Sequence, residues 1–157
     1  MAHIHELIDW TIVAYVIYGK KALFVFHKEL QKWLPLGGHI ELNEDPDEAL
    51  AREVKEESGI EEFEVLSEKP IMNAPERKVL YTPSYMDIHP ISNTHKHIGL
   101  TYFLKVSTDT VQLADQEHEE IRWLSEDDLD DAGINLDSGI KLYAREAIKR
   151  ANVESKG

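Results

Sequence analysis

Residues 46–58 form the segment whose structure the sequence constrains most tightly. Pro46 suits the first turn of an α-helix, where its missing N–H costs nothing, and Gly59 suits the left-handed residue that follows a helix end. Asn43 or Asp45 can cap the N-terminus with a side-chain oxygen. We therefore predict a helix over 46–58. Its apolar side is formed by Ala49, Leu50, Ala51 and Val54.

Strands are predicted on both sides of this helix. The β-branched and aromatic runs 10–18 and 22–27 are separated by a turn at Gly19 and indicate a hairpin. In the segment 32–41, Pro35 and two adjacent glycines predict a loop with close backbone approach. The further strands are expected at 63–66, 78–82, 85–91, 97–106 and 120–124. A helical turn at 125–131 and a last helix capped by Asp137 or Ser138 complete an α/β sandwich around one core.

Composition limits the size and the partners of this chain. A length of 157 residues predicts a single domain over 1–157. The 17 Lys and Arg against 30 Asp and Glu give a net charge of −13, which repels a nucleic-acid polymer. The sequence has neither cysteine, nor an apolar run that could cross a membrane, nor a signal peptide at residues 1–6. We therefore expect no disulfide, no thiol nucleophile, no membrane contact and a cytoplasmic location.

Three glutamates share one face of the predicted helix. Glu53, Glu56 and Glu57 are spaced i, i+3 and i+4. Stacked like charges destabilise a helix by about 0.2–0.5 kcal/mol per pair, and each acid near the C-terminus costs roughly 0.3–1 kcal/mol more. A hard dication such as Mg²⁺ offsets this cost because it takes oxygen ligands. The cluster therefore indicates either a metal site or a solvated acidic face, and Arg52 beside it can orient a carboxylate.

The segment from Gly38 to Ile60 resembles the Nudix box. That motif runs glycine, five residues, glutamate, seven residues, arginine–glutamate, an aliphatic, any residue, two glutamates, any residue, glycine and an aliphatic. Every specified position matches, at Gly38, Glu44, Arg52, Glu53, Val54, Glu56, Glu57, Gly59 and Ile60. The N-terminal hairpin, the lead-in to the box and residues 119–124 are also similar, so the resemblance extends over nearly the whole chain.

The resemblance implies a fold and a metal site. The fold would be a Nudix-like α/β/α sandwich with a curved mixed sheet. The protein would be a pyrophosphohydrolase that cleaves a diphosphate linkage in a small nucleoside-diphosphate-linked or nucleotide substrate. Its cofactor would be Mg²⁺, for which Mn²⁺ can substitute. The implied metal ligands are Glu53, Glu56, Glu57 and the backbone carbonyl of Gly37.

The resemblance also implies how the reaction proceeds. A metal-activated water would attack phosphorus in line, after a base removes its proton. Glu53 is the first choice for that base, and Glu117, in a loop before Trp123, is the second, with an ordinary exposed acid as its alternative. Arg52 would orient Glu53. The shape of the box would be held by Glu44 and Gly59.

Substrate contacts are less constrained by the sequence. We predict them at Trp33, Gly38, His39, Tyr81, Tyr85 and His97. The two tyrosines either stack on a base or are ordinary strand aromatics, and Trp33 either packs on a base or closes the core. His95 and His97 alternate along a strand near His89, which favours imidazoles contacting phosphate over a dedicated transition-metal site. Pro75 lies 15 residues beyond the box, near where relatives acting on ADP-ribose carry a proline.

Three other functions are compatible with parts of this pattern. A non-catalytic Nudix domain could sense a nucleotide or bind a partner, although such domains usually lack box glutamates that are all present here. An isoprenoid diphosphate isomerase of the same fold would use a catalytic cysteine, which this chain lacks. A purely structural acidic domain is supported by composition alone. Homodimers are common in the resembled family, so we also consider a homodimer here.

Overall fold

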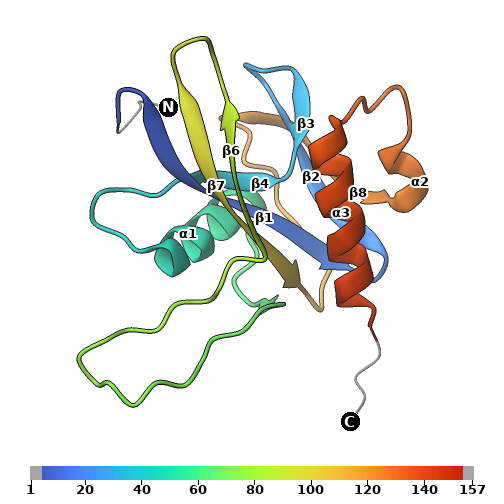
Figure 1. Ribbon diagram of the computed structural model, residues 1–157. Coiled ribbons are helices and arrows are strands. Elements are labelled where there is room, and N and C mark those ends of the chain that lie inside the picture. Colours follow the sequence, from blue (N-terminus) through green and yellow to red (C-terminus); the bar gives the residue numbers. More distant parts are fainter. Residues whose placement is uncertain (1–4, 154–157) are drawn as a thin grey trace.

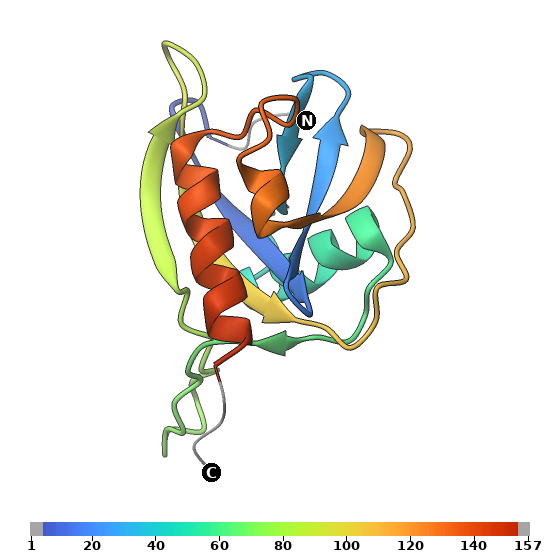
Figure 2. The ribbon, with the colours of Figure 1, turned by 90° about the vertical axis from the view of Figure 1, so that its right-hand side faces the viewer.

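The computed structural model describes residues 5–153, which form a mixed sheet with helices packed on both faces (Figures 1 and 2). The helices are α1 (Pro46–Ser58), α2 (Glu126–Leu129) and α3 (Ser138–Ala151). The strands are β1 (Ile8–Tyr18), β2 (Lys21–His27), β3 (Lys32–Leu34), β4 (Leu36–His39), β5 (Glu64–Val65), β6 (Tyr85–Pro90), β7 (Lys96–Lys105) and β8 (His118–Ser125).

Strand β1 organises the sheet. The main strand order is β3-β2-β1-β7-β5, while β4 pairs with β1, β6 with β7 and β8 with β2. The β1–β7 pair is parallel, in register from Ile8 opposite Lys96 to Ile17 opposite Lys105, and the other pairs are antiparallel. This mixed sheet between helices confirms the predicted α/β/α architecture.

The two faces of β1 enter two different cores, because side chains alternate along a strand. Ile12 and Val16 pack in one cluster with the apolar side of α1. Tyr15 and Ile17 pack in a second cluster with α3, whose buried side includes Ala144. Burying each large side chain contributes about 1.5–3 kcal/mol, so both helices are held mainly by the sheet.

Helix α1 begins and ends where the sequence predicts. Asp45, one of the two expected caps, accepts the Glu48 N–H through Oδ1 at 2.9 Å, and Glu48 Oε1 accepts the Asp45 N–H at 3.1 Å. Gly59 has φ 78° and ends the helix with a hydrogen bond to the Lys55 carbonyl. The assignment of Ala51 to the apolar side was wrong, because its position on the helix turns it outward to solvent.

Two expected elements differ from the structure. The predicted loop at 32–41 is wrong, because its residues form β3 and β4, with Gly37 and Gly38 paired to Val13 and Ile12 of β1. The predicted strand at 78–82 is also wrong. The backbone N–H of Tyr81 there is directed at the Asp47 carboxylate, 3.3 Å away, so it is not part of a strand ladder.

The remaining elements follow the predictions with shifted ends. The hairpin is β1–β2, the expected strand at 63–66 shortens to β5, and β6, β7 and β8 begin or end within two residues of the expected positions. Asp137 caps α3 by accepting the Ile140 N–H at 2.9 Å. No helix within residues 5–153 is long and apolar enough to cross a membrane. Residues 1–4, on which the expectation about a signal peptide partly depends, lie outside the described range.

Candidate functional site

Two of the three helix glutamates are buried between α1 and strand β4. Glu53 and Glu57 are 5% and 6% exposed, while Glu56 is exposed on the rim of the same helix. The i, i+4 spacing gives Glu53 and Glu57 the same inward direction, toward the backbone of Gly37 and Gly38. Ionising two buried carboxylates costs free energy, so this pair does not stabilise the fold. We therefore infer a functional role for this part of the helix.

Glu57 is held from two directions. The backbone N–H of Gly37 donates to its Oε1 at 2.7 Å, and Nε2 of His118 lies 3.1 Å from its Oε2. Burial raises the pKa of Glu57, and the bonds from His118 and Gly37 oppose that rise. His118 is buried at the start of β8 and was not predicted as a site residue. Its only signal in the sequence is its position next to Glu117.

Glu53 lies directly against the backbone of Gly38. A Cβ atom added to Gly38 would lie 2.2 Å from Oε1 of Glu53 and 2.5 Å from its Cδ. Only glycine therefore leaves this carboxylate in place. Burial, and next the charge of Glu57, raise the pKa of Glu53 to about 8.

Arg52 connects the box glutamates to one another. Its Nε and Nη2 donate to the two carboxylate oxygens of Glu44 at 3.0 and 2.6 Å, and Nη1 donates to Oε1 of Glu53 at 2.8 Å. The same guanidinium also reaches Glu56 at 3.3 Å and the His39 carbonyl at 3.0 Å. The hydrogen bond from Arg52 lowers the pKa of Glu44. Arg52 thus orients Glu53 while it ties α1 to β4.

The family model for the NUDIX domain matches residues 10–144, which contain the complete constellation just described. The chain belongs to the NUDIX family. Membership confirms the Nudix fold and the prediction of a pyrophosphohydrolase-type enzyme. No sequence among curated proteins matches the chain.

Several solved Nudix structures are similar to this one. A NUDIX-family hydrolase from Clostridium perfringens is 31% identical, with a TM-score of 0.78 over 90% of this chain and 96% of that one. A C. elegans Ap4A hydrolase in a binary complex is 21% identical, with a TM-score of 0.58 over 92% and 93%. The NUDIX domain of Shewanella oneidensis NrtR, complexed with ADP ribose, is 15% identical, with a TM-score of 0.62 over 93% and 88%. The last two share the fold.

The Nudix box offers a donor set that suits a hard divalent ion. The carboxylates of Glu53, Glu56 and Glu57 lie on one helix, and Mg²⁺ prefers oxygen ligands. The raised pKa values of Glu53 and Glu57 have the sign expected of buried acids that lack enough positive charge. A cation beside them would supply that charge.

Glu117 lies at the edge of this Nudix site. It precedes His118, its backbone carbonyl accepts the Lys28 N–H at 3.0 Å, and its charge contributes to the raised pKa of Glu57. With His27, Lys28, Glu29 and Gln116 it lines a pocket of about 150 Å³. The loop that carries Glu117 is therefore close to the box, although the two are about sixty residues apart in sequence.

The predicted substrate residues are distributed over three environments. Trp33 is buried, with its ring centroid 5.3 Å from that of Phe26. Tyr85 packs on α3 and its hydroxyl accepts a bond from Arg150 at 3.2 Å. Tyr81 is half-buried beneath Lys69, whose Nζ lies 4.3 Å from the ring centroid. Pro75 is exposed within the long connection between β5 and β6.

His39 and His97 lie together, on the opposite side of β4 from the box glutamates. Their Nε2 atoms are 3.4 Å apart, and Nε2 of His39 is 3.3 Å from Oδ2 of the buried Asp9. Burial and the neighbouring His39 lower the pKa of His97 to about 4. Asp9 was not predicted as a site residue, because its neighbours come from β4 and β7.

Proposed function

We propose that this Nudix protein hydrolyses a diphosphate linkage in a nucleotide or nucleoside-diphosphate-linked substrate, using a divalent metal ion. The observation that carries the proposal is the burial of Glu53 and Glu57 side by side against Gly37 and Gly38. A stable helix gains nothing from two buried acids near its C-terminus. A site for a divalent ion and a diphosphate needs this arrangement.

In this proposal Glu53, Glu56, Glu57 and the carbonyl of Gly37 hold Mg²⁺, for which Mn²⁺ can substitute. The ion would neutralise phosphate charge and make a water molecule more acidic. Arg52 keeps Glu53 aligned through the 2.8 Å bond. The bonds from Gly37 and His118 keep Glu57 aligned. This preorganisation means that little conformational freedom is lost when substrate binds.

The chain's own residues supply the proton transfer. A water oxygen attacks phosphorus in line, the bridging P–O bond breaks on the far side, and Glu53 accepts the proton that the water loses. A general base must carry no proton before the reaction, and the 2.8 Å bond from Arg52 favours the ionised carboxylate of Glu53. Glu117 is the second candidate for the base, since its loop borders Glu57.

For the substrate we propose a small phosphorylated molecule that carries a nucleoside. Structures of the same fold are named for Ap4A hydrolysis and for a complex with ADP ribose, and both molecules contain a diphosphate bonded to adenosine. The net charge of −13 disfavours a nucleic-acid polymer. Trp33 is buried, so Tyr81 and Tyr85, which are both half-buried, are the proposed aromatic contacts for a base.

The test is a hydrolysis screen with Mg²⁺ against nucleoside triphosphates, damaged-base nucleotides, ADP-ribose and dinucleoside polyphosphates. We expect phosphate or nucleotide release from at least one class, and loss of that activity when a chelator removes the ion. Binding of these ligands without any hydrolysis would identify a nucleotide-sensing domain and would overturn the proposal.

The Glu57→Gln variant tests the role of the box directly. It deletes a ligand charge, so we expect turnover to fall by about 100-fold or more, equivalent to several kcal/mol of transition-state stabilisation. We expect no loss of folding, because a neutral side chain at this buried position removes charge repulsion with Glu53. The matched control is Glu62→Gln on the exposed surface, which makes the same chemical change outside the site. A collapse of the melting transition in metal-free buffer for Glu57→Gln would count against this role.

A further inference from the structure

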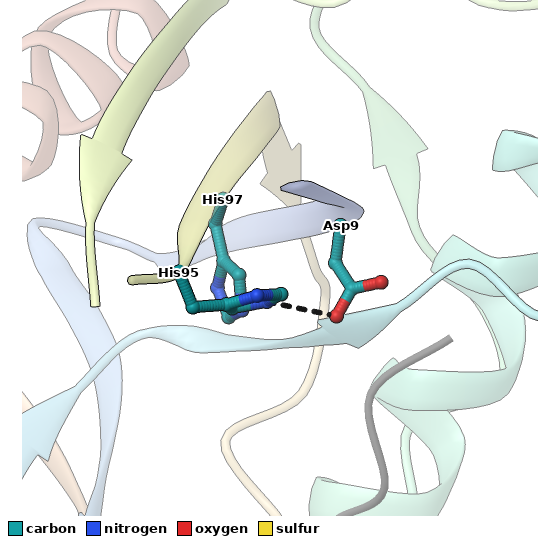
Figure 3. A group of neighbouring side chains, drawn as sticks. All are labelled: Asp9, His95 and His97. Carbon is teal, nitrogen blue, oxygen red and sulfur yellow. Dashed lines mark hydrogen bonds and ion pairs between the residues drawn. The ribbon is translucent and has the colours of Figure 1, made fainter. Parts of the chain in front are cut away.

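A second group of ligating side chains lies on the face of β1 that is opposite to the box glutamates. Asp9, His95 and His97 each offer a donor atom within 4.8 Å of the other two, and no other three such side chains within residues 5–153 come this close. Figure 3 shows the three side chains converging from β1 and from the start of β7. Asp9 is the register partner of His97, and His95 precedes His97 by two residues, so all three share one face.

His39 adjoins this group from β4. Oδ2 of Asp9 lies 3.0 Å from Nε2 of His95 and 3.3 Å from Nε2 of His39, and the Nε2 atoms of His39 and His97 are 3.4 Å apart. In a tetrahedral site with bonds of about 2.0–2.1 Å, neighbouring ligand atoms lie about 3.3–3.4 Å apart. These three spacings are close to those between neighbouring ligand atoms in a zinc coordination shell.

The two ring nitrogens of His95 have different partners. Its Nδ1 lies 3.1 Å from the backbone carbonyl of Glu6, which can only accept, so Nδ1 carries the hydrogen. Its Nε2 faces Oδ2 of the Asp9 carboxylate at 3.0 Å. A divalent ion placed between these two atoms could be ligated by both. Metal-bound histidines commonly donate the other N–H to a carbonyl in this way.

Asp9 is oriented by a partner of its own. The backbone N–H of His5 donates to Oδ1 of Asp9 at 2.7 Å, which leaves Oδ2 directed at His95 and His39. Ligating carboxylates are usually held in this way by an outer hydrogen bond. Both Asp9 and His95 thus have the outer partners that fix a ligand before an ion binds.

We propose that Asp9, His39, His95 and His97 form a second metal site, selective for a transition dication such as Zn²⁺. A set of several imidazoles and one carboxylate suits Zn²⁺, whereas Mg²⁺ prefers oxygen alone. The site joins β1, β4 and β7 at one end of the sheet, so the ion would cross-link three strands. The carbonyl of His39 also accepts a bond from Arg52, which connects this site to the Nudix box. The proposal is independent of the proposed hydrolysis.

Metal uptake by the untagged full-length protein is the decisive measurement. Protein stripped with EDTA is mixed with Zn²⁺ in the presence of excess Mg²⁺, desalted, and analysed for zinc by mass spectrometry. We expect about one Zn²⁺ per chain, a higher melting temperature than the stripped protein, and the strong visible absorption of a tetrahedral site when Co²⁺ replaces Zn²⁺. Wild-type protein that retains no zinc would overturn the proposal.

Three variants separate this site from the Nudix box. His97 is half-buried, and the His97→Gln variant keeps Asp9 and His95 intact. It should weaken zinc affinity by more than about 100-fold, because loss of a hydrogen-bond partner of a ligand already costs up to about 100-fold. His27→Gln removes a histidine outside the cluster and should keep full uptake. Glu57→Gln should also keep it, even if hydrolysis is lost. Loss of zinc in Glu57→Gln with retention in His97→Gln would assign the ion to the box and refute a second site. Circular dichroism of each variant verifies that the fold is intact.

Discussion

Replacement of Gly38 by alanine probes the most crowded contact in the catalytic site. The added Cβ would lie 2.2 Å from Oε1 of Glu53, whereas ordinary contacts begin at 3.4 Å. Because the backbone of Gly38 is paired to Ile12 in the sheet, the Glu53 side chain must move instead, by roughly 1 Å or more. That movement disrupts the 2.8 Å hydrogen bond by which Nη1 of Arg52 orients the Glu53 carboxylate.

A displacement of about 1 Å in a catalytic group can lower the rate by about 100-fold. We therefore expect Gly38→Ala to lose about 100-fold in kcat on whichever substrate the screen identifies. Stability should change little, because the clash is with the end of a flexible side chain. The assays are steady-state kinetics with Mg²⁺ and thermal unfolding of the same preparation.

Two other glycines provide matched controls. At Gly37 the added Cβ would lie 2.4 Å from the backbone oxygen of Ile12, so Gly37→Ala should lower stability as well as activity. At Gly99 the nearest atom would be 3.7 Å away, an ordinary contact, so Gly99→Ala should change neither. Full activity in Gly38→Ala would refute the claim that the position of Glu53 against this backbone matters for catalysis.

Two further predictions concern the box helix. Arg52→Lys should lower the free energy of unfolding by about 1.5–3 kcal/mol, because lysine cannot make the bidentate hydrogen bond to Glu44. An unchanged midpoint in urea titrations would contradict this prediction. Asp45→Ala should lower the free energy of unfolding by about 0.5–2 kcal/mol, because it removes the helix cap. The pKa of Asp45 is lowered from 3.8 to about 2, chiefly by its hydrogen bond with Lys78. The stabilisation by the ionised Asp45 is therefore present above pH 4 and is lost as the pH falls through about 2. The difference between wild type and Asp45→Ala should shrink over that range.

Local signals in the sequence predicted the box helix well. Asp45 and Gly59 act within one turn of the helix ends, so the bounds 46–58 could be derived without knowledge of the rest of the fold. For Gly37 and Gly38 the predicted close backbone approach was right, but the predicted loop was wrong. Close backbone approach is a local property of glycine, whereas their pairing with β1 depends on a strand more than twenty residues earlier.

Contacts between distant segments were beyond local reasoning. His118 meets Glu57 only because β8 pairs with β2 and returns the chain to the end of α1. Asp9 and His95, which are 86 positions apart in the sequence, meet because β1 and β7 run parallel. The histidine alternation at 95 and 97 did predict a shared face. It could not show that an aspartate from another strand completes that face.

Strand β1 supplies both sites from a single stretch of backbone. Ile12 faces the layer that contains the Nudix box, and Asp9 faces the layer that contains the histidines. Because side chains alternate with a period of two, inserting or deleting one residue in β1 would exchange its two faces. The length of this strand is therefore fixed by two chemistries at once.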